Sequence, residues 1–471
     1  MVVGAGPAGV MAAVRAAELG AATTLVTRGH FGGMAATDGP IPVRTLAHAA
    51  RLRRLVPQLG RYGIEVGPPR LDFGALLERT RAVVHDVAAH AAGRTDVTRL
   101  GITVHEQAGA VRFVDAHRLE SADGLRLEAD RIILCTGGVA RRLDVSGAEL
   151  TATHSDAWGL TAAPESLIVI GGGMTGLQVA SIFHTLGTRV DLFQRGPRIL
   201  ADDDADVATA VAASLRASGM GVHEGFGRLD RFEAAPGGVT MHWSKDGVCH
   251  ARTASLVVRA VGWLADASEL NLAAAGVALD ARGFVAVDDH LATSAAHVFA
   301  AGDVTGRSVL VPPAILDGHV AATNAVQGPT LRSDDGALVP MGGFTEPEYA
   351  RVGLTEQAAR AEHDVVVGLL RFDETVRTII DGRTDGFVKL IADRATRKIL
   401  GAHVVGDRAA DLVQAVAIAM AGGLGVDELA RVPLAFPTYV GVLSRAAFRA
   451  ARLIDPAFES PAQRAMGEGD A

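Results

Sequence analysis

One short sequence device occurs twice in this chain, and it constrains the fold more than any other feature. Each copy is a β-branched run, then G-x-G-x-x-G, then an Ala-rich stretch with helical spacing, then a second β run. The first copy is MVVGAGPAG at residues 1–9, and the second is LIVIGGGMTG at residues 167–176. Such glycines allow a tight turn, a close approach of the backbone to a pyrophosphate, and close packing of helix on strand. We therefore predict two nucleotide-binding α/β units, the second inserted into the first.

Other apolar patterns predict the remaining elements. Helices are predicted at residues 71–92 and 412–420. Short strands, several of them apolar enough to be buried, are predicted at residues 102–127, 131–138, 256–262, 297–303, 387–391 and 399–405. From about Gly336 the pattern changes to strands followed by helices, which indicates a separate α+β domain.

Composition and charge exclude several classes of protein. The chain has 471 residues, of which 49% are hydrophobic and 21% charged, so it can bury a large core in roughly three domains. Its formal net charge is −8 and its positive residues are scattered, which argues against a nucleic-acid or membrane partner. The longest apolar stretch, residues 412–426, is interrupted by Gln414 and falls short of the ~20 residues of a membrane span. We expect a soluble protein.

Cysteine usage indicates the compartment. The only cysteines, Cys135 and Cys249, lie far apart and form no CxxC, so we expect neither a disulfide framework nor a zinc site. A reducing cytoplasm is the simplest interpretation. No signal peptide is expected, although only three residues precede Gly4 and we keep open a start upstream of Met1.

We expect no metal site. The acidic run at residues 202–206 is interpreted as a solvated helix start. Four histidines that fall in no ligand spacing are interpreted as structural or exposed: His30, His48, His319 and His403.

The end of the second β run bears on the choice of nicotinamide cofactor. An acidic residue there would bind the ribose 2′-OH of NADH, whereas arginine suits a 2′-phosphate. Here the strand ends in Gln194 and Arg195, with Arg198 close behind, and no carboxylate stands beside them. We therefore favour NADPH, with NADH as the alternative. The other interpretation of the arginines is that they are merely solvated and bind no phosphate.

Three longer segments join the two glycine motifs in a specific pattern: ADRIILCTGG, LATSAAHVFAAGDVTGRSVLV and TDGFVKLIADRATRKILGAHVVGDRAADLV. With them, the whole chain resembles the pyridine nucleotide–disulfide oxidoreductases, which include dihydrolipoamide dehydrogenase, mercuric reductase and soluble transhydrogenase. The resemblance implies two Rossmann-like domains and a C-terminal α+β dimerisation domain in a homodimer. The expected ranges are 1–150 with 275–335 for FAD, 151–274 for NAD(P), and 336–471 for dimerisation.

The resemblance also implies which residues bind the cofactors. FAD is expected at Gly4, Gly6, Pro7, Ala8, Gly9, Thr27, Arg28, Gly33, Met34, Val111, Thr136, Gly137, Gly302, Asp303 and Val311. NAD(P)H is expected at Gly171, Gly173, Met174, Thr175, Gly176, Gln194, Arg195, Arg198 and Gly262. By the resemblance, Asp303 would hold the FAD ribityl chain, and residues 310–314 would aim a helix N-terminus at the N1–C2=O edge of the flavin.

The departures from the family pattern are the informative part. The family's two redox cysteines are replaced by Ala35 and Pro40, within an otherwise intact frame. The His-Pro-Thr segment with its later Glu, which the partner subunit normally supplies, becomes Phe436-Pro437-Thr438 with Gly441. All four dithiol groups are missing, so we expect no dithiol–disulfide chemistry. Soluble transhydrogenases also have an aromatic residue before Pro-Thr.

Substitutions also stand beside the expected flavin. The family's Lys becomes Arg44 and its Glu partner becomes Gln178. Because arginine does not readily lose its proton, Arg44 is expected to act by charge and hydrogen bonding. The alternative is that both residues only pack on the ring. Thr27 replaces the carboxylate that binds the FAD ribose and can still hydrogen-bond a hydroxyl.

An apolar pocket is expected opposite the nicotinamide. By the resemblance it is lined by Met34, Ala35, Pro40 and, from the partner chain, Phe436 and Tyr439. Such a lining suits a flat, largely apolar molecule. Tyr439 could donate a proton to that molecule, and a purely structural tyrosine is the equal alternative.

Three functions follow from this sequence. The leading hypothesis is direct hydride transfer between NAD(P)H, FAD N5 and a small quinone-like, activated C=C or C=N molecule, or oxygen, in either direction. The second is transhydrogenation between NADPH and NAD. The third is a non-catalytic flavin-binding sensor or assembly protein, against which the intact NAD(P) motif argues.

Overall fold

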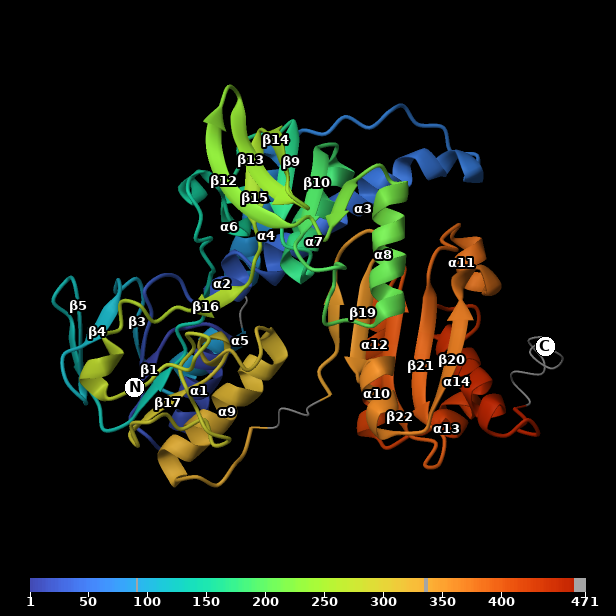
Figure 1. Cartoon of the computed structure of the whole chain (residues 1–471). Coiled ribbons are helices and arrows are strands. Elements are labelled where there is room, and N and C mark those ends of the chain that lie inside the picture. Colours follow the sequence, from blue (N-terminus) through green and yellow to red (C-terminus); the bar gives the residue numbers. More distant parts are fainter. Residues whose placement is uncertain (90–91, 334–337, 461–471) are drawn as a thin grey trace. The chain divides into compact units, whose positions relative to one another are not determined.

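Two units make up the part of the chain that the computed structural model describes, residues 1–89, 92–333 and 338–460 (Figure 1). Unit 1 contains Met1–Leu46, Asp72–Arg142 and Val261–Ala337. Unit 2 contains Ala47–Leu71, Leu143–Ala260 and Leu338–Ala471. The predicted α/β class is confirmed. Because unit 2 holds both the inserted nucleotide-binding part and the C-terminal domain, the three predicted domain ranges stay a proposal.

A five-stranded parallel sheet forms the centre of unit 1, in the order β17-β7-β1-β2-β3. The strands are Val298–Ala300, Ile132–Leu134, Val2–Val3, Thr24–Val26 and Thr103–His105. The three neighbouring strands β17, β7 and β1 are fully buried and consist of apolar residues, as parallel strands covered on both faces require. The strand order makes β1 the middle of the sheet.

Helices cover this sheet. The Ala-rich α1 (Pro7–Glu18) packs against α9 (Val311–Gln327) and against α5 (Ala92–Arg99). Small alanines let α1 and α9 approach closely, and Ala12 and Ala321 are fully buried. The remaining elements of unit 1 are α2 (Gly33–Thr37), α4 (Phe73–Ala89), β4 (Val111–Phe113), β5 (Arg118–Ser121), β6 (Arg126–Glu128), β8 (Gly138–Ala140), β16 (Trp263–Ala265) and the 3-10 turns η3 (Leu272–Ala275) and η4 (Asp303–Thr305).

The inserted part of unit 2 repeats the design with a four-stranded parallel sheet in the order β11-β10-β9-β15. Its strands are Gly221–Glu224, Arg189–Gln194, Ser166–Ile170 and Leu256–Arg259. Helices α6 (His154–Trp158), α7 (Met174–Leu186) and α8 (Ala205–Ala217) belong to this part, and a three-stranded antiparallel sheet follows: β12 (Arg228–Ala235), β13 (Gly238–Lys245) and β14 (Val248–Ala254). The 3-10 turn η2 (Ala148–Leu150) contacts β12.

The C-terminal part of unit 2 is a five-stranded antiparallel sheet in the order β18-β19-β22-β21-β20. The strands are Met341–Gly343, Tyr349–Gly353, Ile399–Val405, Phe387–Asp393 and Val365–Arg371. Helix α12 (Ala409–Ala421) packs on β19 and β22, and α14 (Gly441–Ile454) packs on β20 and β21. The other elements are α10 (Glu356–Glu362), η5 (Phe372–Glu374), α11 (Val376–Ile380) and α13 (Val426–Arg431). This arrangement matches the predicted α+β domain.

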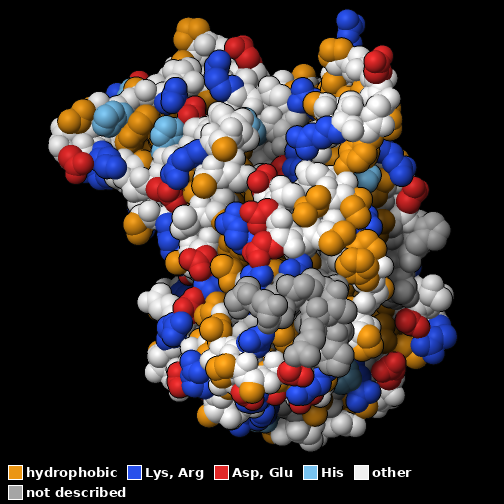
Figure 2. Space-filling model, turned by 90° about the vertical axis from the view of Figure 1, so that its right-hand side faces the viewer, with side chains coloured by type: hydrophobic (Ala, Val, Ile, Leu, Met, Phe, Trp, Pro, Cys, Tyr) orange, Lys and Arg blue, Asp and Glu red, His pale blue; other side chains and the backbone are white. Residues whose placement is uncertain are grey.

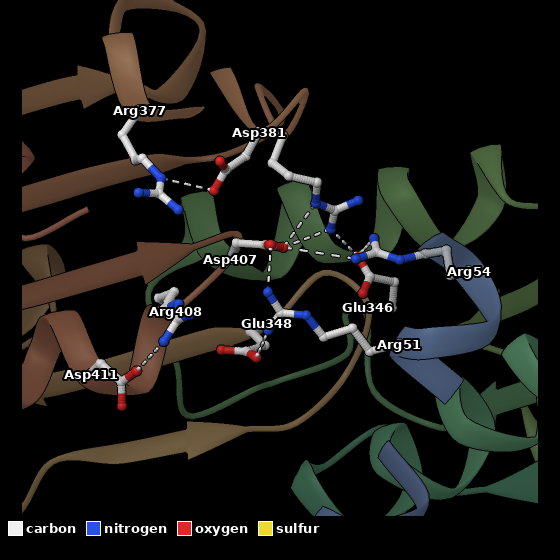
Figure 3. A network of polar contacts seen from close by, with 10 residues as sticks. Arg51, Arg54, Glu346, Glu348, Arg377, Asp381, Asp407, Arg408 and Asp411 are labelled. Carbon is white, nitrogen blue, oxygen red and sulfur yellow. Dashed lines mark hydrogen bonds and ion pairs between the residues drawn. The ribbon is translucent and has the colours of Figure 1, made fainter. Parts of the chain in front are cut away.

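Helix α3 (Pro40–Leu55), which continues into η1 (Val56–Tyr62), ends in an ion network of unit 2 that we call the Asp407 network (Figure 3). Asp407, 6% exposed, accepts hydrogen bonds from Arg51 at 3.0 Å and from Arg383 at 2.6 Å. Arg54 contacts Glu346, to which Arg383 also donates at 2.7 Å. Buried carboxylate and guanidinium groups therefore compensate one another where α3 meets the C-terminal sheet.

The surface carries charges of both signs. On the face drawn in Figure 2, Lys and Arg side chains are interspersed with Asp and Glu rather than gathered in one block. This distribution agrees with the scattered charge of the sequence.

Among the described residues, no helix combines the length and the apolar character that crossing a membrane requires.

Candidate functional site

The carboxyl ends of neighbouring strands bring the predicted FAD residues together. In unit 1 the segments after β17, β7, β1 and β2 leave the same edge of the sheet, since all these strands are parallel. Gly302 and Asp303 follow β17, Thr136 and Gly137 follow β7, and Thr27 follows β2. The first glycine turn follows β1, between them. One sheet edge therefore gathers residues that lie far apart in the sequence.

The first glycine turn has the close contacts that its motif predicts. A Cβ on Gly4 would lie 2.1 Å from the Cys135 carbonyl oxygen, and one on Gly9 would lie 1.8 Å from the Gly4 oxygen. A Cβ added to Gly6, the N-cap residue of α1, would have nothing within 4 Å. The turn is thus packed at its first and third glycines and open at its second, where a pyrophosphate would approach the helix N-terminus.

Two polar groups at this edge, the buried Thr136 hydroxyl and the half-buried Asp303 carboxylate, have room for hydrogen bonds that a bound cofactor would provide. The Thr136 hydroxyl is buried and has no hydrogen-bond partner among the described residues. Burial raises the pKa of Asp303 to about 6, and no cation lies beside its carboxylate in the described part of the chain. FAD offers ribityl and ribose hydroxyl groups that would satisfy both. The residues present therefore fit FAD.

The segment that carries the missing cysteines packs on the same turn. A Cβ on Gly33 would lie 2.8 Å from Gly6 Cα, and the Gly32 N–H donates to the Ala5 carbonyl at 2.8 Å. Helix α2, with Met34 and Ala35, begins there, and Pro40 opens α3. Arg44 lies one turn into α3 and its side chain is exposed. This segment is therefore held at the expected flavin end of unit 1.

Other predicted FAD residues are less directly placed. Thr27 is 7% exposed at the end of β2, whereas Arg28 is exposed and pairs with Asp266 at 3.4 Å and Glu269 at 3.0 Å. Val111 opens β4, and Val311 is the first residue of α9, so the helix N-terminus that the resemblance implies is present.

Sequence reasoning missed Glu106, which follows the neighbouring strand β3. Its carboxylate accepts from the Phe31 N–H at 2.9 Å and from Arg94 at 3.0 Å. Burial opposes these bonds, but they outweigh it and hold the pKa of Glu106 below its usual value. Glu106 thus fixes the loop that leads from β2 to α2. The available signal was a carboxylate directly after a predicted strand.

The second glycine turn repeats the geometry of the first in unit 2. Gly171 has φ +109°, a Cβ on Gly176 would lie 1.9 Å from the Gly171 oxygen, and Gly173 has nothing within 4 Å of an added Cβ. Met174 and Thr175 begin α7. The open middle glycine at a helix N-terminus is the expected place of the NAD(P) pyrophosphate.

Strand β10 ends at Gln194, and Arg195 and Arg198 follow in the next loop, where the three side chains make different contacts. The Gln194 side-chain oxygen accepts from the Gly172 N–H at 2.9 Å, and Arg198 donates to two carbonyls of its own loop. Arg195 is exposed. Gly262, also predicted to bind the nicotinamide cofactor, has φ +110° and follows β15; its carbonyl accepts from the Arg141 N–H in unit 1.

Of the three predicted catalytic residues, Gln178 and Tyr439 lie in unit 2 and Arg44 lies in unit 1. The Gln178 oxygen accepts from the Phe344 N–H at 3.3 Å. Tyr439 is 8% exposed in the core of the C-terminal part, with its ring 6.2 Å from that of Phe372, and burial raises the pKa of its hydroxyl. Whether Tyr439 donates a proton or has a structural role stays a prediction. The pairing of Arg44 with Gln178 stays a prediction.

A model of the pyridine nucleotide-disulphide oxidoreductases matches residues 1–318, and one of their dimerisation domain matches residues 339–447. The chain belongs to this family. It is 32% identical to a dihydrolipoyl dehydrogenase of Mycobacterium tuberculosis over 447 residues, covering 93% of this chain and 95% of the relative. It is 30% identical to a mercuric reductase of Bacillus cereus over 432 residues, covering 91% and 68%.

A solved structure gives the same result. The HOCl-induced flavoprotein disulfide reductase RclA from Escherichia coli superimposes with a TM-score of 0.83 at 25% identity, covering 94% of this chain and 97% of that one. Members of the pyridine nucleotide-disulphide oxidoreductase family bind FAD and NAD(P)H, in agreement with the two expected cofactors. The family's dimerisation domain also supports the expected homodimer.

Neither cysteine of this chain lies in the segment at residues 32–44. Cys135 and Cys249 are both free thiols. Cys135 is 5% exposed and burial raises the pKa of its thiol, whereas Cys249 lies exposed on β14 of unit 2. No group of His, Cys, Asp and Glu side chains in the described ranges could hold a metal ion.

The expectation of a solvated helix start holds for the exposed Asp202 and Asp206 but was wrong for Asp204. Asp204 does start a helix, as the N-cap of α8, but it is not solvated: it is 3% exposed and accepts from Lys389 at 2.9 Å. Lys389 itself is buried and also contacts Asp206 and Glu356. The sequence could not place this lysine beside the run, because 185 residues separate the partners. A lysine inside a buried strand was the available signal.

Proposed function

We propose that this family member transfers a hydride between NADPH and a small, flat, largely apolar molecule through FAD, without a redox disulfide. The observation that carries this proposal is the packing of residues 32–40 on the first glycine turn. By the sequence resemblance, Ala35 and Pro40 of this segment stand for the two family cysteines, in a frame that is otherwise kept. Neither free cysteine lies in that segment.

Named residues would divide the work. The α1 N-terminus at Gly6 would bind the FAD pyrophosphate, and Thr136 and Asp303 would accept or donate hydrogen bonds to its hydroxyl groups. Bound FAD supplies a ring that accepts and returns a hydride at N5. Arg44 would place a fixed positive charge beside this ring.

The second molecule would lie on an apolar surface. Met34, Ala35 and Pro40 would line it from the same chain, and Phe436 from the second copy in a homodimer. Phe436 is 65% exposed, so its ring is available to another chain, whereas Tyr439 is 8% exposed. A flat lining without an acid or base suits a quinone-like molecule or an activated C=C or C=N bond.

NADPH is the proposed hydride donor because Arg195 stands exposed at the end of β10 and the strand-end amide, Gln194, is turned towards Gly172. Arg195→Glu should therefore shift the ratio of kcat/KM values from NADPH towards NADH. An unchanged ratio would contradict the proposed donor.

The decisive experiment follows the flavin absorbance of the purified FAD-loaded protein under anaerobic conditions. NADPH should bleach the absorbance band at about 450 nm rapidly, and a quinone or an activated alkene should then restore it faster than air does. Absence of bleaching would favour the sensor hypothesis. Reoxidation by thio-NAD alone, with no response to quinones or alkenes, would favour a transhydrogenase.

A further inference from the structure

The loop between β10 and α8, residues 195–204, is closed against the second glycine turn. The Leu200 N–H donates to the Gly172 carbonyl at 2.9 Å, and the Gly172 N–H donates to the Gln194 side chain at 2.9 Å. A Cβ on Gly172 would lie 2.8 Å from Ile199 Cγ2, so no space separates loop and turn. The shape of this loop therefore sets where the adenosine end of a dinucleotide meets the turn.

Arg198 holds the loop from inside. Its Nη2 atom donates to the carbonyls of Ala201 at 2.7 Å and Asp203 at 2.9 Å. Its Nη1 atom is buried without a hydrogen-bond partner among the described residues. Between these contacts Leu200 adopts φ +49°, a conformation that a leucine rarely takes unless its surroundings impose it. The guanidinium group thus replaces the backbone partners that the irregular loop lacks.

The far end of the loop is fixed to the C-terminal part of unit 2. Arg351 donates to the Asp202 carbonyl at 2.9 Å and pairs with the Asp203 carboxylate at 3.1 Å. Asp204 accepts from Lys389 at 2.9 Å and from the Glu356 N–H at 3.0 Å. The carboxylates of Asp203 and Asp204 are therefore matched by cations of another sheet, and the Asp202 side chain is exposed to solvent.

Arg195 differs from Arg198 in each of these respects. Its side chain is exposed, and within the described ranges it makes no hydrogen bond or ion pair. Glu224, which pairs across from Gln194 at the end of β11, is itself occupied by the Ile199 N–H at 2.7 Å and by Arg216 at 2.6 Å. The charge offered to a nucleotide at this strand end is therefore that of Arg195.

We propose that the two arginines have separate roles: Arg195 alone binds the 2′-phosphate of NADPH, and Arg198 is a positioning residue that shapes the loop for any adenine dinucleotide. This proposal rests on the NADPH-dependent function proposed above and assigns its cofactor selectivity to one side chain. Arg198 then affects binding of phosphorylated and unphosphorylated nucleotides alike.

The test uses the FAD-loaded protein and two probes, adenosine 2′,5′-bisphosphate and adenosine 5′-monophosphate, with dissociation constants from calorimetry. Arg195→Ala should weaken binding of the bisphosphate about tenfold or more, because a charge-assisted contact is lost, and leave the monophosphate unchanged. Arg198→Ala should weaken both probes by a similar factor of about fivefold or more, with their ratio preserved. Arg198→Lys should restore part of this loss, since an ammonium group can still donate to loop carbonyls.

The outcomes separate this proposal from the function on which it rests. Loss of bisphosphate binding alone in Arg198→Ala would show that Arg198 contacts the phosphate itself and would overturn the proposal. So would unchanged binding of both probes. Equal affinity of the wild-type protein for the two probes would contradict the NADPH assignment and the role of Arg195. Even then, Arg198→Ala would test the positioning role: it is supported if both dissociation constants rise by a similar factor and contradicted if only one of them rises.

Discussion

At the scale of single residues, burial changes what a side chain can do. Asp303 is desolvated at the carboxyl edge of the unit 1 sheet, and burial raises its pKa to about 6. Burial also acts to raise the pKa of Asp204, yet hydrogen bonds from Lys389 and the Glu356 N–H outweigh it and hold that pKa below the usual value. The difference is the cation Lys389 beside Asp204, which has no counterpart beside Asp303 among the described residues.

Asp303 gives a prediction about pH. Its folded-state pKa lies above the value of about 3.9 for an unfolded chain, so the FAD-free protein should lose stability as pH rises from about 4 to 6, by about 2–3 kcal/mol. Asp303→Asn removes this loss. At pH values above about 7, the FAD-free variant should therefore have a higher unfolding midpoint temperature than the FAD-free wild-type protein. The same variant should bind FAD more weakly. Asp123→Asn, an exposed control, should change neither quantity, and a lower midpoint in Asp303→Asn would contradict the argument.

Arg44 gives a prediction about rate. Arg44→Ala removes the fixed cation expected beside N5 and should slow bleaching of the FAD by NADPH about tenfold or more in stopped-flow experiments. Arg44→Lys keeps a positive charge and should retain most of the rate. Identical rates in all three proteins would leave Arg44 with a packing role only.

At the scale of elements, buried ion groups join secondary structures that are distant in sequence. Lys389 on β21 connects the start of α8 to the C-terminal sheet, with 3% of its side chain exposed. The Asp407 network likewise connects the end of α3 to the segment before β19 and to the loop after β22 (Figure 3). Such groups are costly to break from one side, because the remaining charge stays buried.

Lys389→Met should therefore destabilise the protein by about 3–5 kcal/mol, since Asp204 would remain buried without its cation. Chemical denaturation monitored by circular dichroism measures this. Lys398→Met, an exposed lysine at the start of the neighbouring strand, is the matched control and should change stability by less than about 0.5 kcal/mol. Equal effects of the two substitutions would refute a special role for Lys389.

Asp407→Asn should cost about 3–5 kcal/mol at neutral pH, because three arginines lose their shared carboxylate. Burial acts to raise the pKa of Asp407, but the guanidinium groups of Arg383, Arg51 and Arg54 together outweigh it and hold the pKa below its usual value. Its stabilising effect is thus complete above about pH 4 and lost as pH falls through the folded-state value. The control is Asp411→Asn. Asp411 is exposed and pairs with Arg408, so its substitution should change the free energy of unfolding very little. An unchanged free energy of unfolding in both variants would contradict a stabilising role of the Asp407 network.

At the scale of the whole molecule, two units each contain a glycine turn with an open middle position. Each turn follows a strand of a parallel sheet, which is the position where this class of fold binds nucleotides. The chain thus keeps one such turn in each unit.

A thiol test follows at this scale. Cys249→Ser leaves the buried Cys135 as the single thiol, so NADPH oxidation with a quinone should stay within about twofold of wild type and should not respond to iodoacetamide. The wild-type protein should be equally insensitive. Inhibition of the wild type that Cys249→Ser abolishes would show that a thiol takes part in turnover.

The sequence by itself determined the class of fold and the two cofactor turns. Short-range patterns are enough for this, because β-branched runs, glycine spacing and helix periodicity act within about 30 residues. The sequence also shows alanine at position 35 and proline at position 40. The neighbouring glycines and prolines align these two positions with the family's cysteine pattern.

Only the tertiary structure decided what several polar residues do. It buried Asp204 beside Lys389, enclosed Tyr439 in a core, turned Gln194 towards Gly172 and occupied Arg198 with its own loop. The physical reason is that desolvation and pairing depend on partners brought in by distant strands. The same arginine or aspartate can be solvated, bound to a ligand or structural, and its neighbours in space, not in sequence, decide which.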